Sequence, residues 1–302
     1  MTLPPRGYLR AQGLGNDYLV VEEAGFGLPM TAARARRLCD RHLGVGSDGV
    51  LVGSGSIAGA DARVAIFNPD GSEAEKSGNG VRIFAAYCFA RGGAPADRPL
   101  AIATRGGLTT ARLRERRADE LVLQVSLGHV RWEMHALPMI RADGRAPEAG
   151  ESWIARPLTV GGREVLATCL SVGNPHAVLL GAPCDAATLA ELGPAVERHA
   201  QFPQRVNVQL CEVIDRHAVR ALVWERGAGP TQASGSSACA VVAACARAGR
   251  VELDAEVEVR MPGGNLSVRV SADGALEQTG PVAEIAVGTI ADHLWRALER
   301  DG

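Results

Sequence analysis

Residues 77–92 read SGNGVRIFAAYCFARG, and residues 234–249 read SGSSACAVVAACARAG. Each stretch begins with Ser-Gly, continues as an apolar, alanine-rich run and stops at a glycine, which is the pattern of a helix between its N-cap and its C-terminal turn. At an offset of 157 residues the two stretches share Ser77/Ser234, Gly78/Gly235, Ala86/Ala243, Cys88/Cys245 and Gly92/Gly249. The sequence therefore predicts two apolar helices of the same design, half a chain apart.

The segments before these helices are repeated as well. RVAIFNPDGSEAEK (63–76) precedes the first helix and RALVWERGAGPTQA (220–233) precedes the second, each a short apolar strand followed by a polar loop. Further upstream, GLGND (13–17) and SVGNPH (171–176) align Gly-Asn with Gly-Asn at an offset of 158 residues. Because the order Gly-Asn turn, strand, loop, Ser-Gly and helix occurs twice, we predict two homologous domains.

The remaining patterns indicate the fold class. Strands outnumber helices and do not alternate regularly with them, which favours an α+β fold over a doubly wound sheet. We predict helices at 32–41, 186–199 and 291–300, strands at 120–127, 164–170, 206–213, 256–261 and 266–270, and a surface loop at 141–151. We place the first domain at residues 1–128 and the second at 129–302, whose last helix is able to pack back on the first domain.

Composition excludes several classes of protein. The 302 residues leave room for two domains, and their 4% aromatic content requires cores built from Ala, Val and Leu. With 32 Lys and Arg against 34 Asp and Glu, the chain offers no basic field for nucleic acid. It contains no apolar run of membrane-spanning length, and its first residues lack the apolar stretch of a signal peptide, so we expect a cytoplasmic protein without a membrane partner.

Neither the cysteines nor the histidines are spaced as metal ligands. The seven cysteines include no CxxC pair, and the seven histidines include no HxxxH or HxH pair. We therefore expect reduced thiols, no disulfide framework and no metal.

The two Ser-Gly helix starts suggest an anion site. A helix N-terminus presents unpaired backbone N–H groups and the positive end of a dipole. Two such ends, one from each domain, facing across a cleft would bind a small carboxylate and place Ser77 and Ser234 on opposite sides of one carbon. That geometry suits removing a proton from one face and returning it on the other. The alternative is that both serines are only N-caps.

Lys76 is the only lysine in the chain, which otherwise carries 31 arginines. It adjoins Ser77, so one interpretation is that the amine, partly desolvated and facing helix dipoles, has a lowered pKa and acts as a general base. The other interpretation is a lysine that points to solvent.

With these motifs in hand, the sequence resembles the diaminopimelate epimerases, which are cofactor-independent amino-acid epimerases. The resemblance rests on GLGND (13–17), GVGSDGVL (44–51), FNPDGSEAEKSGNGVR (67–82), SVGNPHAV (171–178) and WERGAGPTQASGSSACA (224–240). It implies two pseudo-symmetric α/β domains, each a strand-rich barrel around a central helix, with the site between them. It also implies an amino-acid substrate, no cofactor and a homodimer.

The resemblance also implies roles for individual residues. The expected substrate contacts are Asn16, Asn68, Gly78, Asn79, Asn174, Asn207, Glu225, Arg226, Gly235 and Ser236. Of these, Asn68, Asn207, Glu225 and Arg226 would hold the end of the substrate that does not react. His176 would support the residues that move the proton.

The sequence departs from the family at the two reacting positions, where the family has cysteines and this chain has Ser77 and Ser234. A thiol has a pKa of about 8.5 that a helix N-terminus lowers further, whereas a serine hydroxyl is several units less acidic. Three functions stay open: an epimerase acting on LL- and meso-diaminopimelate or a close analogue, a divergent isomerase or dehydratase on the same scaffold, and a non-catalytic amino-acid binder.

Overall fold

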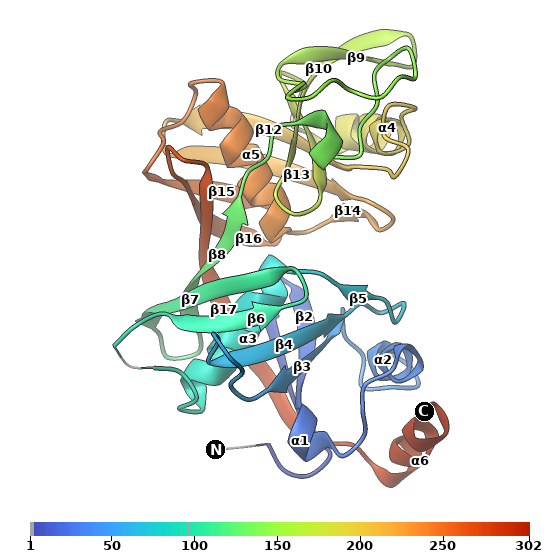
Figure 1. Cartoon of the computed structure of the whole chain (residues 1–302), viewed down its shortest axis with the longest axis vertical. Coiled ribbons are helices and arrows are strands. Elements are labelled where there is room, and N and C mark those ends of the chain that lie inside the picture. Colours follow the sequence, from blue (N-terminus) through green and yellow to red (C-terminus); the bar gives the residue numbers. More distant parts are fainter. Residues whose placement is uncertain (1–2, 96) are drawn as a thin grey trace. The chain divides into compact units, whose positions relative to one another are not determined.

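The computed structural model of the protein describes residues 3–95 and 97–302 and divides into two compact units. The first unit combines the chain up to residue 125 with residues 279–302, and the second unit comprises residues 126–278. Figure 1 shows the course of the chain through both units.

A closed ring of strands forms the frame of the first unit. The order of pairing is β1–β2–β3–β4–β6–β7–β8–β17, and β17 pairs with β1 to close the ring. The strands are β1 (Gly7–Gly13), β2 (Asn16–Glu22), β3 (Val50–Ser54), β4 (Ala62–Phe67), β6 (Leu100–Thr104), β7 (Gly107–Arg116), β8 (Leu121–His129) and β17 (Ala275–Thr289), and the short β5 (Glu73–Ala74) pairs with β4.

Helix α3 (Gly78–Ala90) is the central helix of this barrel. It contacts β1, β2, β3, β4, β6 and β7, and every residue from 79 to 88 is buried. A helix that is apolar all round is stable only where it is covered all round, and the apolar run after Ser77 meets that condition. The structure thus confirms the first of the two predicted apolar helices.

A second layer covers the outside of the first unit. It contains α1 (Glu23–Phe26), α2 (Ala32–Cys39) and α6 (Asp292–Arg300), and Trp295 of α6 packs edge-on against Phe26 with ring centroids 5.4 Å apart. Residues 279–302, which we expected in the second domain, therefore belong to the first unit. The physical reason is the antiparallel pairing of β17 with β1, from Gly7 opposite Thr289 to Gln12 opposite Ala283.

The second unit repeats the design. Its strands pair in the order β10–β11–β12–β13–β15–β16, and Arg131, just after β8, exchanges two backbone hydrogen bonds with Ser171 at the end of β10. Helix α5 (Gly235–Arg247) is the central helix and contacts all six of these strands. The bounds are β9 (Arg156–Val160), β10 (Arg163–Ser171), β11 (Pro175–Leu180), β12 (Asn207–Asp215), β13 (Ala218–Glu225), β14 (Gly229–Thr231), β15 (Glu256–Met261) and β16 (Gly264–Val270).

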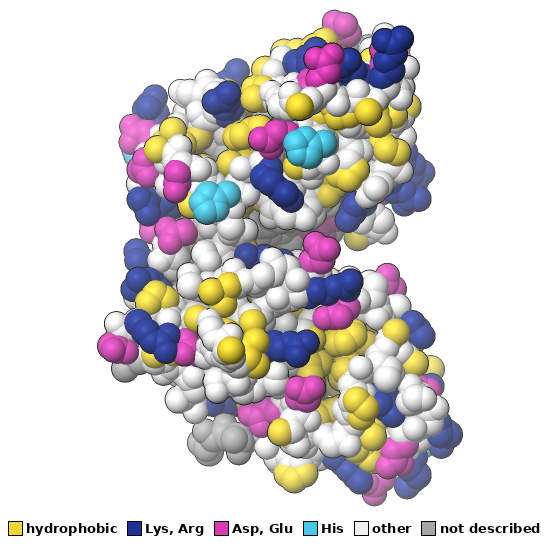
Figure 2. Space-filling model, in the orientation of Figure 1, with side chains coloured by type: hydrophobic (Ala, Val, Ile, Leu, Met, Phe, Trp, Pro, Cys, Tyr) yellow, Lys and Arg dark blue, Asp and Glu magenta, His cyan; other side chains and the backbone are white. Residues whose placement is uncertain are grey.

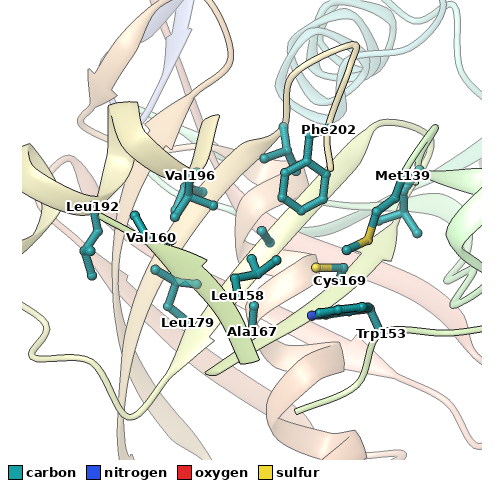
Figure 3. Packing of buried hydrophobic residues seen from close by; sticks show 14 of the residues in the cluster. Met139, Trp153, Leu158, Val160, Ala167, Cys169, Leu179, Leu192, Val196 and Phe202 are labelled. Carbon is teal, nitrogen blue, oxygen red and sulfur yellow. The ribbon is translucent and has the colours of Figure 1, made fainter. Parts of the chain in front are cut away.

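A separate core lies on the outside of this barrel, between its strands and α4 (Ala186–Glu197). Figure 3 shows Leu192 and Val196 of α4 approaching Val160 and Leu179, with Phe202 and Trp153 closing the cluster. The one-turn 3-10 helix η1 (Met134–Ala136) adds Met134 to it. Outside the aromatic pair, the core consists mostly of Val, Leu, Ala, Met and Cys, as the composition requires.

Most of the predicted elements are present with small shifts at their ends. The helices predicted at 32–41, 186–199 and 291–300 are α2, α4 and α6, and the loop at 141–151 contains no helix or strand. The strand at 256–261 has the predicted bounds. On the face drawn in Figure 2, described Lys and Arg side chains are interspersed with Asp and Glu. Among the described residues, no helix is both long and apolar enough to cross a membrane.

Candidate active site

Ser77 is the N-cap of α3. Its backbone is extended (φ −136°, ψ 119°), and its Oγ accepts a hydrogen bond from the backbone N–H of Gly80 at 3.1 Å. The hydroxyl of Tyr18, on β2, lies 3.3 Å from the same oxygen. Ser77 therefore has the capping role expected of a serine at a helix start and also a side-chain partner from the sheet.

Asn16 and Asn79 hold the start of β2 against the first turn of α3. The side-chain amide of Asn79 donates to Oδ1 of Asn16 at 2.7 Å and to the Asn16 carbonyl at 3.1 Å. The other atom of the amide, Oδ1, accepts from Arg82 at 2.5 Å. A Cβ at Gly13 would lie 2.4 Å from this Oδ1, so the close approach requires glycine there.

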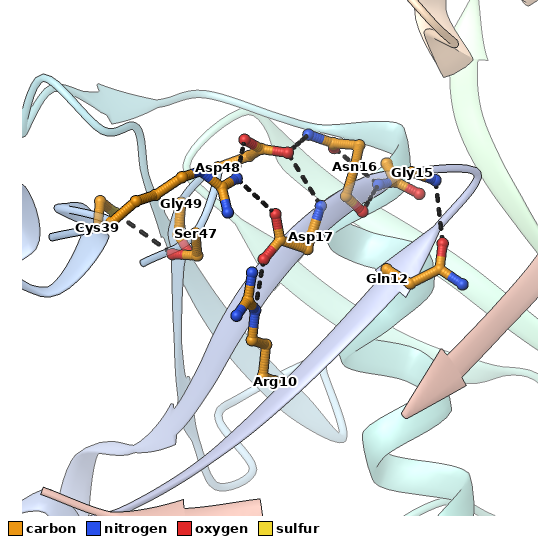
Figure 4. Close-up of polar contacts among 11 residues, drawn as sticks. Arg10, Gln12, Gly15, Asn16, Asp17, Cys39, Ser47, Asp48 and Gly49 are labelled. Carbon is orange, nitrogen blue, oxygen red and sulfur yellow. Dashed lines mark hydrogen bonds and ion pairs between the residues drawn. The ribbon is translucent and has the colours of Figure 1, made fainter. Parts of the chain in front are cut away.

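A chain of charges on the outside of β1 and β2 fixes Asn16 from its other side (Figure 4). Asp48 accepts from the Asn16 amide at 2.9 Å, and Arg41 bridges Asp48 and Asp17 at 2.7 and 2.8 Å. Arg10 donates to Asp17 at 2.7 Å. Burial acts to raise the pKa of Asp17, but the hydrogen bonds and charges of Arg41 and Arg10 outweigh it and hold that pKa below its usual range.

Three other predicted residues of the first unit, Asn68, Lys76 and Gly78, lie nearby in sequence. Asn68 follows β4 in a turn, where its side-chain amide donates to Ser72 Oγ at 2.9 Å and its backbone carbonyl accepts from Gly71 N–H. Lys76 is half-buried and directly precedes Ser77. Gly78, the first residue of α3, presents its backbone at the helix start.

Ser234 occupies the N-cap position of α5 with an extended backbone (φ −148°, ψ 123°) but makes no side-chain capping bond. Its Oγ lies 3.5 Å from Oγ of Ser236, and the amide of Asn174 donates to Ser236 Oγ at 3.4 Å. The two long contacts place Asn174, Ser234, Gly235 and Ser236 around the first turn of α5. The two serines thus differ, because only Ser77 caps its helix through its side chain.

His176 supports Asn174 from inside the second unit. Its Nε2 lies 2.8 Å from Asn174 Oδ1, and the amide of Gln209 donates to its Nδ1 at 3.0 Å. This pattern places the ring proton on Nε2, which donates to Asn174. Burial lowers the pKa of His176 to about 3, and repulsion from Arg226 acts in the same direction. The imidazole is therefore neutral at pH 7.

Asn207 ties β12 to the hairpin that carries Glu225 and Arg226. Its Oδ1 accepts from the Arg226 backbone N–H at 3.0 Å, and its amide donates to the carbonyl of Pro175 at 2.9 Å. Glu225 is half-buried at the end of β13, and the Arg226 side chain is exposed.

Buried Glu197, at the end of α4, holds the same hairpin from below. It accepts from the Trp224 indole N–H and the Gly227 backbone N–H, both at 2.9 Å. Hydrogen bonds to the Glu197 carboxylate and to Asn207 therefore hold this hairpin in place, in addition to apolar packing.

A second buried glutamine lies against the start of α5. Gln278 is fully buried, and neither atom of its amide has a hydrogen-bond partner among the described residues. A Cβ at Gly235 would lie 2.4 Å from Gln278 Oε1, so a larger residue at the second position of the Ser-Gly motif would displace this amide. The sequence comparison of the two halves predicted a glycine at position 235 but not its contact with Gln278.

A pocket of about 320 Å³ lies elsewhere in the first unit and contains none of the predicted site residues. It is lined by Ile83, Ala86 and Ala90 from the middle and end of α3, away from Ser77. Its lining also includes Arg117 and Glu120, which pair with each other.

Over residues 3–95 and 97–302, no three His, Cys, Asp or Glu side chains gather as metal ligands.

Sequence reasoning missed Tyr18 and Gln209. The signal for Tyr18 was available, since Tyr18 follows the first Gly-Asn as His176 follows the second, at the same offset of 158 residues. Gln209 carried no local signal, because it meets His176 only through the parallel pairing of β11 with β12.

Comparisons with known proteins agree with the repeated design. The family model described as diaminopimelate epimerase matches residues 8–133 and 168–285. The diaminopimelate epimerase of Desulforudis audaxviator (strain MP104C) is 40% identical over 283 residues, which cover 93% of this chain and 98% of that protein.

Two solved structures share the fold. A hydroxyproline epimerase from Agrobacterium vitis has a TM-score of 0.63 at 16% identity, covering 93% of this chain and 91% of its own. A methylitaconate-delta-isomerase has a TM-score of 0.63 at 11% identity and covers 94% of each chain. These two likenesses establish the α+β fold, while the family model and the 40% identity establish descent. The chain belongs to the diaminopimelate epimerase family, a family of amino-acid isomerases.

Proposed function

We propose that this protein is a cofactor-independent epimerase that interconverts LL- and meso-diaminopimelate, or a close analogue, by moving a proton at the α-carbon. Ser77 handles the proton on one face and Ser234 on the other. The observation that carries the proposal is that each unit places a serine at the start of its buried central helix, beside asparagine side chains that are themselves held by hydrogen bonds.

The reacting end of the substrate supplies an α-carboxylate, which suits the helix starts. Backbone N–H groups at Gly78 and Gly235 and the positive ends of α3 and α5 favour a negative charge. The same groups stabilise the extra charge that develops on the carboxylate when the α-proton leaves, without needing a metal or pyridoxal phosphate. Asn16, Asn79, Asn174 and Ser236 supply the further polar contacts.

The far end of the substrate carries a second amino-acid group, and the hairpin in the second unit offers matching chemistry. Arg226 can pair with a carboxylate, while Glu225 and the amide oxygens of Asn68 and Asn207 can accept from an ammonium. This set of charges favours a substrate with ionic groups at both ends over a simple apolar amino acid.

Lys76 is proposed as a general base beside Ser77, in line with its half-buried position. Replacing it with arginine keeps the positive charge but removes a group able to lose its proton. Turnover that is unchanged in Lys76→Arg would remove Lys76 from the mechanism.

A second function is favoured by the two serines themselves. Because a hydroxyl is a weaker base than a thiolate, a substrate with a more acidic C–H bond would suit this pair better. A double-bond isomerase or dehydratase would use such a substrate, and the methylitaconate-delta-isomerase has the same fold. None of the seven cysteines replaces the missing thiols, since all are buried, and burial raises the pKa of Cys88, on α3, to about 12.

The test is proton NMR of the purified protein with meso-diaminopimelate in deuterium oxide. The proposal expects loss of the α-proton signal above a protein-free control, loss of that activity in Ser77→Ala and Ser234→Ala, and full activity in Ser56→Ala, an exposed serine. Binding without exchange would support the amino-acid binder, and neither binding nor exchange would favour the isomerase on another substrate.

We also propose that the protein forms a homodimer. Ile285 and Val287 are 50% and 55% exposed and lie close together on β17, at and beside an irregularity in its pairing with β1. Exposed apolar side chains in a row are suited to a second copy of the chain. Light scattering should give twice the chain mass, and Ile285→Glu with Val287→Glu should give the monomer.

A further inference from the structure

The strongest unassigned feature is the contact between Tyr18 and Ser77. The phenol oxygen lies 3.3 Å from Ser77 Oγ, and Tyr18 is only 6% exposed. Tyr18 is paired with Ala11 across β1 and β2, and Ala11 is buried with its neighbour Leu9, so the ring shares the face of the sheet that meets α3. Its hydroxyl therefore reaches the serine from the interior of the barrel.

The ring of Tyr18 has its own cradle. A Cβ at Gly49 would lie 2.5 Å from Tyr18 Cε1 and 2.6 Å from the carbonyl of Phe67, so only glycine leaves room for the ring. The Gly49 backbone is itself fixed, since its carbonyl accepts from Leu19 N–H at 3.0 Å and from Ser47 Oγ at 2.8 Å. The position of the phenol is therefore determined by several independent contacts.

The duplication adds an independent argument. Tyr18 and His176 occupy the same position of the two repeats, two residues after Gly-Asn. Each is a buried ring that carries a polar atom, and each contacts a polar group of its own unit, Ser77 in one case and Asn174 in the other. A buried polar ring at this position is therefore common to both repeats.

We propose that Tyr18 is the proton-accepting partner of Ser77, an inference that rests on the proposed function. As the α-C–H bond breaks, its proton moves to Ser77 Oγ, and the hydroxyl proton of Ser77 moves to the phenolate oxygen of Tyr18. The electron pair of the C–H bond stays on the substrate, spread into the carboxylate. Ser234 then delivers its proton to the other face, and solvent resets both groups.

The chemistry and the geometry agree with this direction of transfer. A phenol has a pKa of about 10, much closer to that of a thiol at about 8.5 than a serine hydroxyl is. Gly80 N–H already donates to Ser77 Oγ, so the serine's own hydrogen is best directed at Tyr18. The same N–H stabilises negative charge as it develops on Oγ.

The charged groups around Tyr18 are mostly compensated. Arg10 on β1 pairs with Asp17, which precedes Tyr18 on β2. Arg41, in the loop after α2, bridges Asp17 and Asp48 of the same loop. Inside the barrel the cation of α3 is Arg82, and Lys76 precedes the helix. The role of base therefore rests on the contact between the phenol oxygen and Ser77 Oγ.

The test uses Tyr18→Phe, which keeps the ring in its cradle, with Tyr8→Phe on β1 as the matched control. α-Proton exchange is measured from about pH 6 to about pH 11, across the range in which a phenol ionises. We expect wild type to show a rate that rises with pH, Tyr18→Phe to lose at least about tenfold together with that rise, and Tyr8→Phe to match wild type.

A second variant separates chemistry from structure. In a Ser77→Cys background the thiol ionises without help, so Tyr18→Phe should change the exchange rate by less than about twofold. Equal losses in the serine and cysteine backgrounds would overturn the proton-accepting role, as would an unchanged pH profile in Tyr18→Phe. Wild type without any exchange would instead defeat the proposed function.

Discussion

The side-chain amide of Asn79 donates to Oδ1 of Asn16 at 2.7 Å, which joins the first turn of the central helix to the first residue of β2. Asn79 also accepts from Arg82, so one buried amide serves three neighbouring groups. The proposed substrate contacts of the first unit are therefore coupled, and changing one should move the other.

Asn79→Ala should destabilise the fold and weaken substrate binding together. The change removes two donors from Asn16 and one acceptor from buried Arg82, at a cost of about 1–3 kcal/mol of unfolding free energy. Urea unfolding and calorimetric titration with diaminopimelate measure the two effects. Asn265→Ala, at an exposed strand position, is the control and should change neither. A stable Asn79→Ala protein with unchanged affinity would contradict the coupling.

Replacing Ser77 and replacing Ser234 should affect the stability of the protein differently, although both serines are proposed to act on the proton. Ser77→Ala removes a helix cap and should lower the unfolding free energy by about 1 kcal/mol. Ser234 makes no capping bond, so Ser234→Ala should leave stability within about 0.5 kcal/mol of wild type. Thermal unfolding of the two variants side by side measures this difference. Equal losses of stability would mean that Ser234 also caps its helix in solution.

The buried imidazole of His176 should make the protein less stable in mild acid. Its folded pKa of about 3 lies below the unfolded value of about 6.5, so the unfolded state takes up a proton that the folded state refuses. The stabilising contribution is complete above about pH 6.5 and falls by about 1.4 kcal/mol per pH unit between pH 6.5 and pH 3.

Unfolding by urea at a series of pH values tests this expectation. His176→Gln keeps a donor for Asn174 but removes the titrating group, so its stability should depend less on pH than that of wild type. His42→Gln, the same change at an exposed histidine, should retain the wild-type slope. Identical slopes for His176→Gln and wild type would show that this imidazole titrates normally.

Arg226→Ala should weaken binding of the substrate's far end without unfolding the hairpin. The hairpin is held by the Arg226 backbone N–H on Asn207 and by Glu197 on Trp224 and Gly227, none of which needs the guanidinium. The variant loses a charge-assisted hydrogen bond to the substrate, which contributes about 1.5–3 kcal/mol. The dissociation constant should therefore rise about ten- to hundredfold. Calorimetric titration of Arg226→Ala with diaminopimelate should show the weaker binding. Titration with alanine, which lacks the far end, should give an unchanged affinity.

Much of the fold could be predicted because its signals are local. Ser-Gly before an apolar run indicates a helix start, and the mostly apolar character of residues 83–88 and 238–245 indicates helices that must be covered. The family resemblance named Asn16, Asn79, Asn174 and Ser236 as substrate contacts. The structure joins Asn79 to Asn16 and Asn174 to Ser236 by hydrogen bonds within each unit.

The membership of residues 279–302 could not be predicted from local pattern. The alternation of β17 is that of any half-buried strand, and it does not reveal the partner strand. Its pairing with β1, about 280 residues away in the chain, assigns its C-terminal part to the first unit. A contiguous second domain follows from the order of the segments along the chain, but strand pairing assigns residues 279–302 to the first unit.

The duplicated motifs, the two central helices and the family follow from residue type and order, because capping, turn formation and apolar periodicity act over a few neighbouring residues. The partners of the site residues do not follow from order. Tyr18 reaches Ser77 across 59 residues and Gln209 reaches His176 across 33, and both contacts depend on tertiary structure, which packs β2 against α3 and pairs β12 with β11. Long-range packing determines such contacts, since it alone decides which side chains share a buried interior.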